Sequence, residues 1–209
     1  MKTFDIITEA DARTLEIGAT VSLKPGGHVT PLAADTLKAR RITVLSSVAG
    51  ASLDGLAPVA DIKSVAIGSD HSGVALKAAL RDHLRQRGLR VLDVGTEGPD
   101  PVDYPDIAAQ VARLVARKEV DAGIVIDGAG LGSAIAANKI PGARAAMCND
   151  KTLARYAREH NGANVLALGA SLISADEARA IVETWLATPM GEARYLRRLA
   201  KIRALEKMP

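Results

Sequence analysis

Large aromatic side chains are scarce in this chain of 209 residues, where Phe, Trp and Tyr together make up 2%. A chain so poor in rings has few groups on which nucleic-acid bases stack, so we expect no nucleic-acid partner. Its single cysteine, Cys148, excludes an intramolecular disulfide and a cysteine-rich metal site. No apolar run approaches the length of a membrane span, and the first ten residues contain acids. We therefore expect no membrane segment and no signal peptide, and a cytoplasmic protein.

Charge of one sign is not in large excess either. The formal net charge is +3 at pH 7, and much of the basic excess follows Arg194. This distribution indicates a local basic patch rather than a surface that binds a polyanion along its whole length. Apolar residues make up 48% and charged residues 24%, an ordinary balance for a chain with a real core.

From Ser64 onward, short apolar runs alternate with Ala-rich amphipathic stretches. Strands that alternate with helices form right-handed βαβ units, so this pattern predicts a parallel sheet covered by helices on both faces. We expect a doubly wound, Rossmann-like α/β domain of about five strands, with ligands beyond the carboxyl ends of the strands. The expected strands are 64–68, 90–94, 122–126, 143–147 and 164–168, and the expected helices are 73–87, 104–118, 133–139, 151–159 and 175–186.

The first 60 residues have a different pattern. Thr8, with an acid three residues later, predicts a capped helix start, and Thr30-Pro31 predicts a second short helix. Residues 23–27 (LKPGG) predict a turn, and residues 46–58, rich in Ser, Gly and Ala, predict a linker. This part is too small for a large core.

We therefore divide the chain into two parts. Residues 1–60 form an N-terminal appendage with its linker, and residues 61–209 form the main α/β domain, including a C-terminal helix.

Candidate functional residues follow the predicted strands. Asp70 and His71 follow the first strand, and Asp127 ends the third, just before a loop with Gly at every second position, Gly128–Gly132. Such a loop can direct backbone amides inward beside a helix start, to bind a phosphate or the oxyanion of an enediolate, or it can be only a tight turn. We expect His160, after the next predicted helix, on the same rim as His71.

Each of these side chains has a structural alternative. Asp127 at the end of an apolar strand would have a raised pKa through desolvation and act as a base, or it could cap a helix. Asp70 and His71 could form a capping pair, and His160 could cap a helix end before Asn161. Two arginines four residues apart on one helix face could bind a phosphate together or form a solvated basic face: Arg194 and Arg198.

Taken together, four segments resemble the type B ribose-5-phosphate isomerase family, which includes the galactose-6-phosphate isomerase subunits. The resemblance extends from residue 64 to about residue 203. It implies a homodimer, or a dimer of dimers, with sites between subunits, and an aldose–ketose isomerase that needs no metal or organic cofactor. The segments are Gly68-Ser69-Asp70-His71-Ser72-Gly73 with Leu76-Lys77, Asp103-Tyr104-Pro105, Gly128-x-Gly130-x-Gly132 with Ile135-Ala136-Ala137-Asn138-Lys139, and Arg158-Glu159-His160-Asn161-x-x-Asn164-Val165-Leu166.

The resemblance also implies roles for individual residues. His71, with Asp70 beside it, would contact the phosphate or the open-chain sugar, and Tyr104 would belong to the same substrate site. His160, assisted by Asn161, would open the sugar ring. The remaining positions are the enediolate-stabilising amides of Gly128, Ala129, Gly130, Leu131 and Gly132, and the phosphate-binding Arg194 and Arg198, which would reach a neighbouring subunit's site.

The chain departs from the family's pattern around the expected base. Asp127 replaces a catalytic Cys, Ser133 stands where other members use Glu, and Ala129 replaces a Thr or Ser that assists proton transfer. Ser171 stands where many members have a phosphate-binding Arg. Asp127 is then the candidate base for a four- to six-carbon sugar phosphate that reacts through a cis-enediolate.

Two other functions remain open. One is a non-catalytic sugar-phosphate binding protein on the same scaffold. The other, phosphoryl transfer with Asp127 as nucleophile, ranks lower because the Asp-x-Asp pattern of a metal site is absent.

The appendage has a likeness of its own. The pattern Leu23-x-Pro25-Gly26-x-x-x-Thr30-Pro31-x-Ala33-x-Asp35-x-Leu37 resembles N-terminal segments of bacterial microcompartment enzymes. It implies docking of residues 1–60 to a shell or a partner enzyme, within such a compartment. A segment that extends the homodimer interface is an equal alternative.

Overall fold

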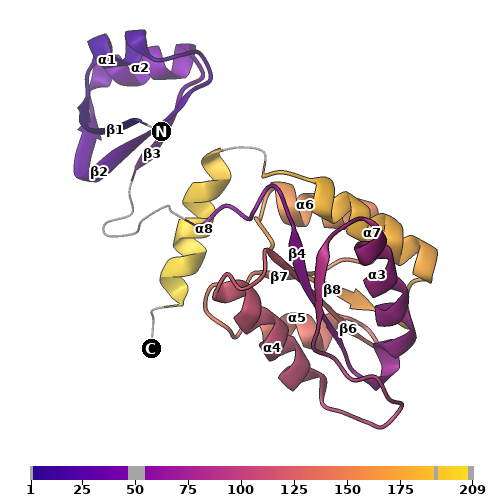
Figure 1. Cartoon of the computed structure of the whole chain (residues 1–209). Helices are drawn as coiled ribbons and strands as arrows, with labels where there is room; N and C mark the ends of the chain where they lie inside the picture. Colours follow the sequence, from indigo (N-terminus) through magenta and orange to yellow (C-terminus); the bar gives the residue numbers. More distant parts are fainter. Residues whose placement is uncertain (1, 47–54, 191–192, 207–209) are drawn as a thin grey trace. The chain divides into compact units, whose positions relative to one another are not determined.

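A computed structural model of the chain describes residues 2–46, 55–190 and 193–206. Contacts divide the chain into two compact units, one formed by residues 1–56 and 191–209, the other by residues 57–190 (Figure 1). This division differs from the expected one in a single respect. The C-terminal helix α8 (Ala193–Leu205) packs with the first unit, against the last strand of its sheet.

The second unit is the predicted doubly wound domain. Its five parallel strands lie in the order β5-β4-β6-β8-β7, and each predicted strand and helix is present within a few residues of its expected bounds. The strands are β4 (Ser64–Ser69), β5 (Arg90–Asp93), β6 (Ala122–Asp127), β7 (Ala145–Met147) and β8 (Val165–Gly169), and the helices are η1 (His71–Gly73), α3 (Val74–Gln86), α4 (Tyr104–Ala116), α5 (Leu131–Ala137), α6 (Lys151–Glu159) and α7 (Ala175–Ala187).

The two faces of this sheet carry side chains of different size. Large residues such as Ile67, Ile124 and Leu166 pack under α3, α6 and α7, whereas the face under α4 and α5 presents mainly Ala and Val. At Gly123, a Cβ atom would lie 2.6 Å from a methyl group of Val111, and at Gly68 equally close to Ile107. Helix α4 therefore lies very close to the sheet, as the scarcity of large rings allows.

The first unit contains a small parallel sheet that the sequence did not indicate. Its strands, in the order β1-β2-β3, alternate with two helices, and apolar residues between sheet and helices form a core of its own. Both predicted helix starts are confirmed, a capping box at Thr8 and an N-cap at Thr30. The elements are β1 (Lys2–Ile7), α1 (Glu9–Thr14), β2 (Thr20–Val29), α2 (Pro31–Ala39) and β3 (Thr43–Ser46).

The turn predicted at residues 23–27 is wrong, because these residues lie inside β2. Leu23 pairs with Phe4 and His28 with Ile6, so β2 has extra residues opposite a single residue of β1. The strand accommodates them as an irregularity, with Gly27 against the carbonyl of Asp5, where a Cβ atom would lie 2.5 Å away. The predicted linker, residues 46–58, falls largely on residues 47–54, outside the described part of the chain.

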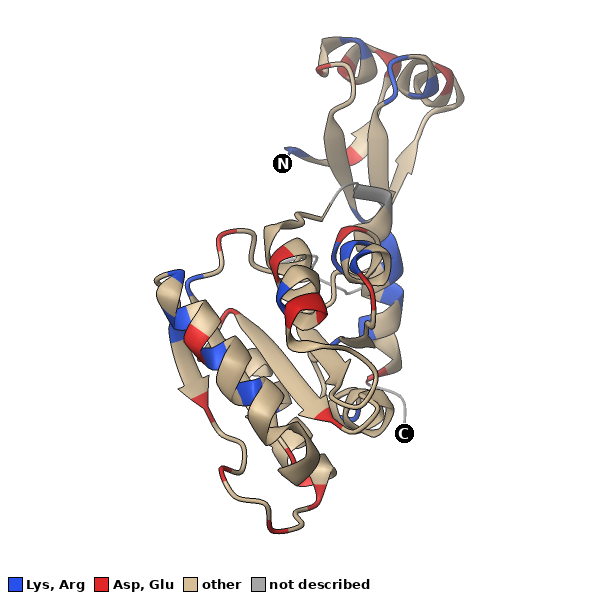
Figure 2. Ribbon diagram, turned by 90° about the vertical axis from the view of Figure 1, so that its right-hand side faces the viewer, with Lys and Arg blue, Asp and Glu red and all other residues tan. Residues whose placement is uncertain are grey.

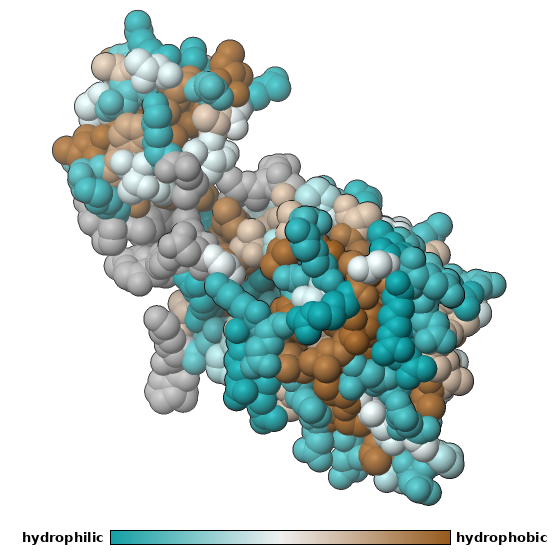
Figure 3. All heavy atoms as spheres, in the orientation of Figure 1, coloured by the Kyte–Doolittle hydropathy of each residue, from teal (hydrophilic) through white to brown (hydrophobic). Residues whose placement is uncertain are grey.

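Two surface properties complete the description. Lys and Arg recur along α8 (blue in Figure 2), whereas one face of the second unit exposes apolar side chains between hydrophilic ones (Figure 3). Within the described ranges, no helix combines the length and the apolar character needed to cross a membrane.

Candidate active site

The carboxyl ends of β4, β5, β6 and β8 bring four loop segments together at one edge of the sheet. The amide of Asp70 donates to the carbonyl of Ile126 (3.2 Å), and the amide of Thr96 donates to the carbonyl of Ser69 (3.1 Å). The amide of Ser171 donates to the carbonyl of Gly128 (3.0 Å). These bonds join the segments after all four strands into one candidate site, at the place where open parallel sheets bind ligands.

Asp127 lies at the centre of this edge, and its carboxylate is 5% exposed. Its Oδ1 accepts the amides of Ala129 (2.8 Å) and Gly130, and its Oδ2 accepts the amide of Ser133 (2.8 Å). The expectation of a raised pKa is therefore wrong. Burial by itself raises the pKa of Asp127, but the hydrogen bonds from Ser133, Gly130 and Ala129 outweigh it, so the pKa lies below its usual value.

The Gly128–Gly132 loop lies between a strand and a helix as predicted, but two of its amides, those of Ala129 and Gly130, already bind the Asp127 carboxylate. Gly130 adopts φ 76°, which favours glycine and turns the amides of residues 129 and 130 toward the Asp127 carboxylate. Ala129 is partly exposed, and Leu131 is 58% exposed at the first position of α5. The loop thus holds an anion, and that anion is a side chain of the chain itself.

Asp70 and His71 lie beside this loop, and part of their arrangement is structural. One carboxylate oxygen of Asp70, Oδ1, accepts from the amide (3.0 Å) and hydroxyl (2.6 Å) of Ser72, so Asp70 caps the short helix η1. Its Oδ2 has no hydrogen-bond partner among the described residues. His71 is exposed, and its Nδ1 accepts the amide of Val102 in a long bond of 3.4 Å. Oδ2 of Asp70 and Nε2 of His71 are therefore available to a ligand.

Tyr104 begins α4 and reaches the glycine loop. A Cβ atom at Gly132 would lie 2.5 Å from the Tyr104 ring, so the ring lies directly on that residue. Two hydroxyl groups are close to Gly128, where a Cβ atom would lie 3.7 Å from Ser72 Oγ and 3.9 Å from Ser171 Oγ. The structure thus brings Tyr104 into the candidate site. Its phenol ring lies at one end of the glycine loop, and the two serine hydroxyls lie at the other.

His160 and Asn161 are not on this rim, and that prediction is wrong. Helix α6 connects the carboxyl end of β7 to the start of β8, and the two strands are parallel, so the end of α6 lies at the opposite edge of the sheet. The next residues confirm this position, since the amide of Asn164 donates to the carbonyl of Arg144, just before β7. There the His160 ring stacks on Tyr156, with 4.8 Å between ring centroids. A helix reverses the direction of the chain, so a residue that follows it leaves the rim.

The turn that carries His160 is fixed from behind by Arg158. This side chain is fully buried, lies 4.8 Å above the Trp185 ring, and donates to the carbonyls of Ala163 (2.9 Å) and Val59 (2.8 Å). Burial lowers the pKa of Arg158 to about 10, with the charge of Arg144 adding to the effect, so the group remains charged at neutral pH.

The predicted phosphate-binding arginines lie on α8. Arg198 is exposed, with its guanidinium carbon 5.7 Å from the centroid of the Tyr195 ring, whereas the side chain of Arg194 is outside the described part of the structure. Their position relative to the candidate site is not determined, because α8 groups with the first unit.

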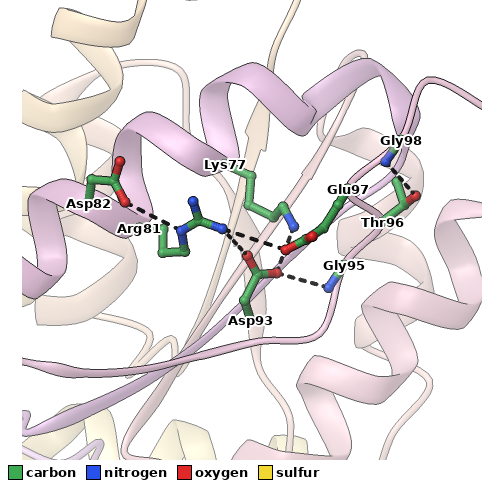
Figure 4. Close-up of polar contacts among 8 residues, drawn as sticks. All are labelled: Lys77, Arg81, Asp82, Asp93, Gly95, Thr96, Glu97 and Gly98. Carbon is green, nitrogen blue, oxygen red and sulfur yellow. Dashed lines mark hydrogen bonds and ion pairs between the residues drawn. The ribbon is translucent and has the colours of Figure 1, made fainter.

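Two further residues carried part of the resemblance but were given no role from the sequence. Ser69, the last residue of β4, is fully buried, and its hydroxyl has no hydrogen-bond partner in the part of the chain that the structure describes. Lys77 is 1% exposed and forms an ion pair with Asp93 at the root of the loop that leads to Tyr104 (Figure 4). A lysine on the apolar face of an amphipathic helix was the signal available in the sequence.

The remaining polar chemistry is limited. Cys148 is buried, and burial, together with the charge of Asp150, raises the pKa of its thiol to about 12. Within residues 2–46, 55–190 and 193–206, no group of three or more His, Cys, Asp or Glu side chains is arranged to bind a metal ion.

Comparison with known proteins places these features in a family context. Residues 65–202 match the ribose/galactose isomerase family. Ribose-5-phosphate isomerase B of Escherichia coli is 42% identical over 146 residues, which are 70% of this chain and 98% of that protein. D-erythrulose-4-phosphate isomerase of Pectobacterium atrosepticum is 41% identical over 125 residues, 59% of this chain and 82% of that protein.

Solved structures give the same result. That of ribose-5-phosphate isomerase B from Clostridium thermocellum is 49% identical and has a TM-score of 0.68, covering 69% of this chain and 97% of that one. That of the enzyme from Mycoplasma genitalium with bound ribulose-5-phosphate is 37% identical with a TM-score of 0.68, covering 70% of this chain and 97% of that one.

Proposed function

The chain belongs to the ribose/galactose isomerase family, and from that premise we propose that it interconverts the aldose and ketose forms of a four- to six-carbon sugar phosphate. One observation carries this proposal. Every segment of the candidate sheet edge, from the end of β4 to the end of β8, lies within residues 65–202, the region that matches the isomerase family. The fold, the glycine loop and the His71 segment are those that such a reaction would use.

The reaction proposed is a proton transfer between adjacent carbons. A base removes the proton from C2 of the open-chain aldose, which leaves a cis-enediolate, and the same group returns a proton to C1 while the proton of the C2 hydroxyl moves to O1. No metal or organic cofactor is needed for these steps, so we propose that activity persists after dialysis against EDTA. A loss of activity that added Mg²⁺ or Zn²⁺ restores would contradict metal independence.

Asp127 is the proposed base. Ser133 contacts the carboxylate through both its amide, which donates to Oδ2 at 2.8 Å, and its side chain, so Asp127 could take a proton only by giving up one of these bonds. The lowered pKa keeps the carboxylate ionised at neutral pH but makes it a weak base, so its strength would depend on losing an amide bond when substrate binds. Asp70 is the competing candidate for the base, because its Oδ2 accepts no hydrogen bond from the described residues. Comparing variants of Asp70 and Asp127 therefore decides which of them is the base.

The first experiment is a screen of sugar phosphates with four to six carbons, including ribose 5-phosphate and erythrulose 4-phosphate, read by product formation in deuterated water. Solvent deuterium should enter C2 of the aldose or C1 of the ketose. Asp127→Asn should abolish this exchange while a thermal shift with sugar phosphate persists. Full exchange in Asp127→Asn, or its loss in Asp70→Asn alone, would remove Asp127 from the role of base.

The separation of His160 from the candidate site supports a homodimer with shared sites. If His160 and Asn161 open the sugar ring, they must come from a second copy, because in one chain they lie at the other edge of the sheet. Leu131 and Ile135, which are 58% and 63% exposed on α5 beside the glycine loop, offer apolar surface for that contact. The phosphate would be bound by Arg194 and Arg198, since Ser171 contributes no charge.

A mixing experiment tests this arrangement. His71→Ala and His160→Ala homodimers should each be inactive, whereas a dimer containing one subunit of each kind has one intact shared site. Unfolding the two variants together and refolding them at equal concentration should restore about a quarter of wild-type activity, because half of the dimers are mixed and each mixed dimer has one site. No recovery, with a dimer seen by light scattering, would contradict shared sites.

A binding protein without turnover is the second candidate function. The specific observation in its favour is that the Asp127 carboxylate occupies the amides of Ala129, Gly130 and Ser133, which an enediolate would otherwise use. A thermal shift with one sugar phosphate, and no product from any, would favour this alternative.

For residues 1–60, we keep the proposal that they dock the protein to a microcompartment shell or a partner enzyme. Their independent core, centred on Ile7, Val21 and Leu37, is consistent with a separate binding module. Replacing residues 1–60 with an unrelated segment should reduce the amount of protein that co-purifies with the shell, and it should leave the kinetic constants of the isomerase unchanged. An altered oligomeric state would instead indicate a role in the homodimer interface.

A further inference from the structure

Lys77 is a buried cation with no role in the proposed chemistry. Its side chain is 1% exposed, and its ammonium group lies 2.7 Å from Oδ1 of Asp93, itself 12% exposed. Arg81 contacts the other oxygen of Asp93 at 3.2 Å (Figure 4). Burying an ion pair contributes little stability, because desolvation of both charges opposes their attraction. The contacts of the pair with the loop that follows β5 indicate a different role, in positioning that loop.

Asp93 ends β5 and fixes the start of the loop that follows. The same Oδ1 that accepts from Lys77 also accepts the amide of Gly95 at 3.2 Å (Figure 4). Gly95 lies directly on the backbone of Ser69, where a Cβ atom would be 2.3 Å from the Ser69 nitrogen. The next amide, of Thr96, donates to the Ser69 carbonyl at 3.1 Å. The loop thus begins in contact with the residue that precedes Asp70 and His71.

The far end of the same loop reaches two groups of the candidate site. Val102 donates its amide to Nδ1 of His71, and Tyr104, which begins α4, places its ring on Gly132. While Nδ1 accepts this bond it carries no proton, so the neutral imidazole has its proton on Nε2. The loop therefore determines both which nitrogen of His71 can donate to a ligand and where the Tyr104 ring lies.

We infer that Lys77, paired with Asp93, is a positioning residue for the candidate site. Through the loop of residues 94–103, the ion pair holds His71 as the Nε2–H tautomer and Tyr104 over the glycine loop. The inference rests on the proposed function, because only there does His71 contact the substrate. Misplacement of such a group by about 1 Å can reduce turnover 10²-fold, so the ion pair can affect turnover although it does not touch the reacting atoms.

The test replaces both charges together, because replacing Asp93 alone would leave Lys77 as a buried charge without its carboxylate partner. Lys77→Met combined with Asp93→Leu should fold with a melting temperature close to that of wild type, since apolar replacement of a buried pair is often neutral. The ¹⁵N shifts of the His71 ring, assigned with His71→Asn, should change from a single tautomer to a mixture. With the substrate found in the screen, kcat/KM should fall about 10- to 100-fold.

Arg81→Gln is the matched control, because Arg81 contacts Asp93 but not the Gly95 amide, and its contact with the loop is a 3.7 Å ion pair to Glu97, whose side chain is 80% exposed. It should leave the His71 signals and kcat/KM unchanged. Val102→Pro is the second variant, since it removes the amide donor to His71 and leaves the ion pair intact. It should reproduce the tautomer mixture and the kinetic loss, even if the double variant fails to fold.

The outcomes are distinct. A single His71 tautomer with kcat/KM within about twofold of wild type, in the folded double variant or in Val102→Pro, overturns the inference. The tautomer measurement needs no turnover. If wild type converts no sugar phosphate, the proposed function fails, and the His71 signals still decide whether the ion pair positions this histidine.

Discussion

Replacement of Asp127 by Asn should destabilise the protein by an amount that the contacts of its carboxylate set. Asn retains one acceptor oxygen, for the amides of Ala129 and Gly130, but presents an NH₂ group to the amide of Ser133. The lost bond to a charged acceptor is worth about 1.5–3 kcal/mol. Removing the negative charge at the start of α5 costs a further ~0.3–1 kcal/mol. We expect a loss of about 2–4 kcal/mol in the free energy of unfolding at pH 7.

The pH dependence gives this prediction a sign. The folded-state pKa of Asp127 lies below the reference value of 3.8, so ionisation stabilises the folded state fully above pH 3.8. That stabilisation is lost as the pH falls through the lower, folded-state pKa. The difference between wild type and Asp127→Asn should therefore be constant from pH 7 to about pH 5 and should shrink below pH 4.

Urea unfolding at stepped pH values, followed by circular dichroism, measures the difference directly. Asp82→Asn serves as control, because the Asp82 side chain is 61% exposed and should change stability by less than about 0.5 kcal/mol. An Asp127→Asn protein as stable as wild type at pH 7 would refute the reasoning. So would a difference that stays constant down to pH 3, since folding would then not lower the pKa of the carboxylate.

Three further predictions follow from the same site. In Gly132→Ala the new Cβ would meet the Tyr104 ring, so the variant should have a higher KM and lose about 1–2 kcal/mol of stability, measured by kinetics and thermal melts. Gly98→Ala is the control, because its Cβ would lie 4.0 Å from the nearest atom, and it should change neither KM nor stability. Arg158→Met removes the donor to the carbonyls of Ala163 and Val59, so denaturant titration should show a loss of about 2–4 kcal/mol, with kcat reduced through the His160 turn. If Asp127 is the base, kcat/KM should stay constant as the pH falls from about 7 to about 5, because the carboxylate remains ionised. A decrease in kcat/KM with a midpoint near about pH 6.5 would implicate a histidine instead.

The sequence predicted the second unit well because its pattern has a simple physical cause. Strands such as β4, β6 and β8 are buried on both faces, so they read as continuous apolar runs between amphipathic helices. The first unit lacks such runs, and β2 contains Pro25, Gly26 and Gly27 inside the strand. Its pairing became visible only with β1 and β3 on either side.

The sequence predicted that Asp70, His71, Asp127 and the glycine loop lie at one edge of the sheet, but not the electrostatics of that edge, nor the position of His160. Burial of Asp127 could be read from the apolar strand before it, whereas the direction of three amides depends on the path of the backbone through Gly130. The position of His160 could have been derived, because a single helix separates it from the rim. The Lys77–Asp93 pair joins residues sixteen positions apart, and neither residue type indicates the other.

The state of the chain's one thiol has a consequence for chemical durability. Cys148 is buried, and its pKa of about 12 leaves almost no thiolate at neutral pH. Electrophiles and peroxides attack thiolates, so the Cys148 thiol should remain unmodified by iodoacetamide or hydrogen peroxide while the protein is folded. Such a molecule is suited to surroundings in which reactive aldehydes or oxidants would inactivate an enzyme that depends on cysteine.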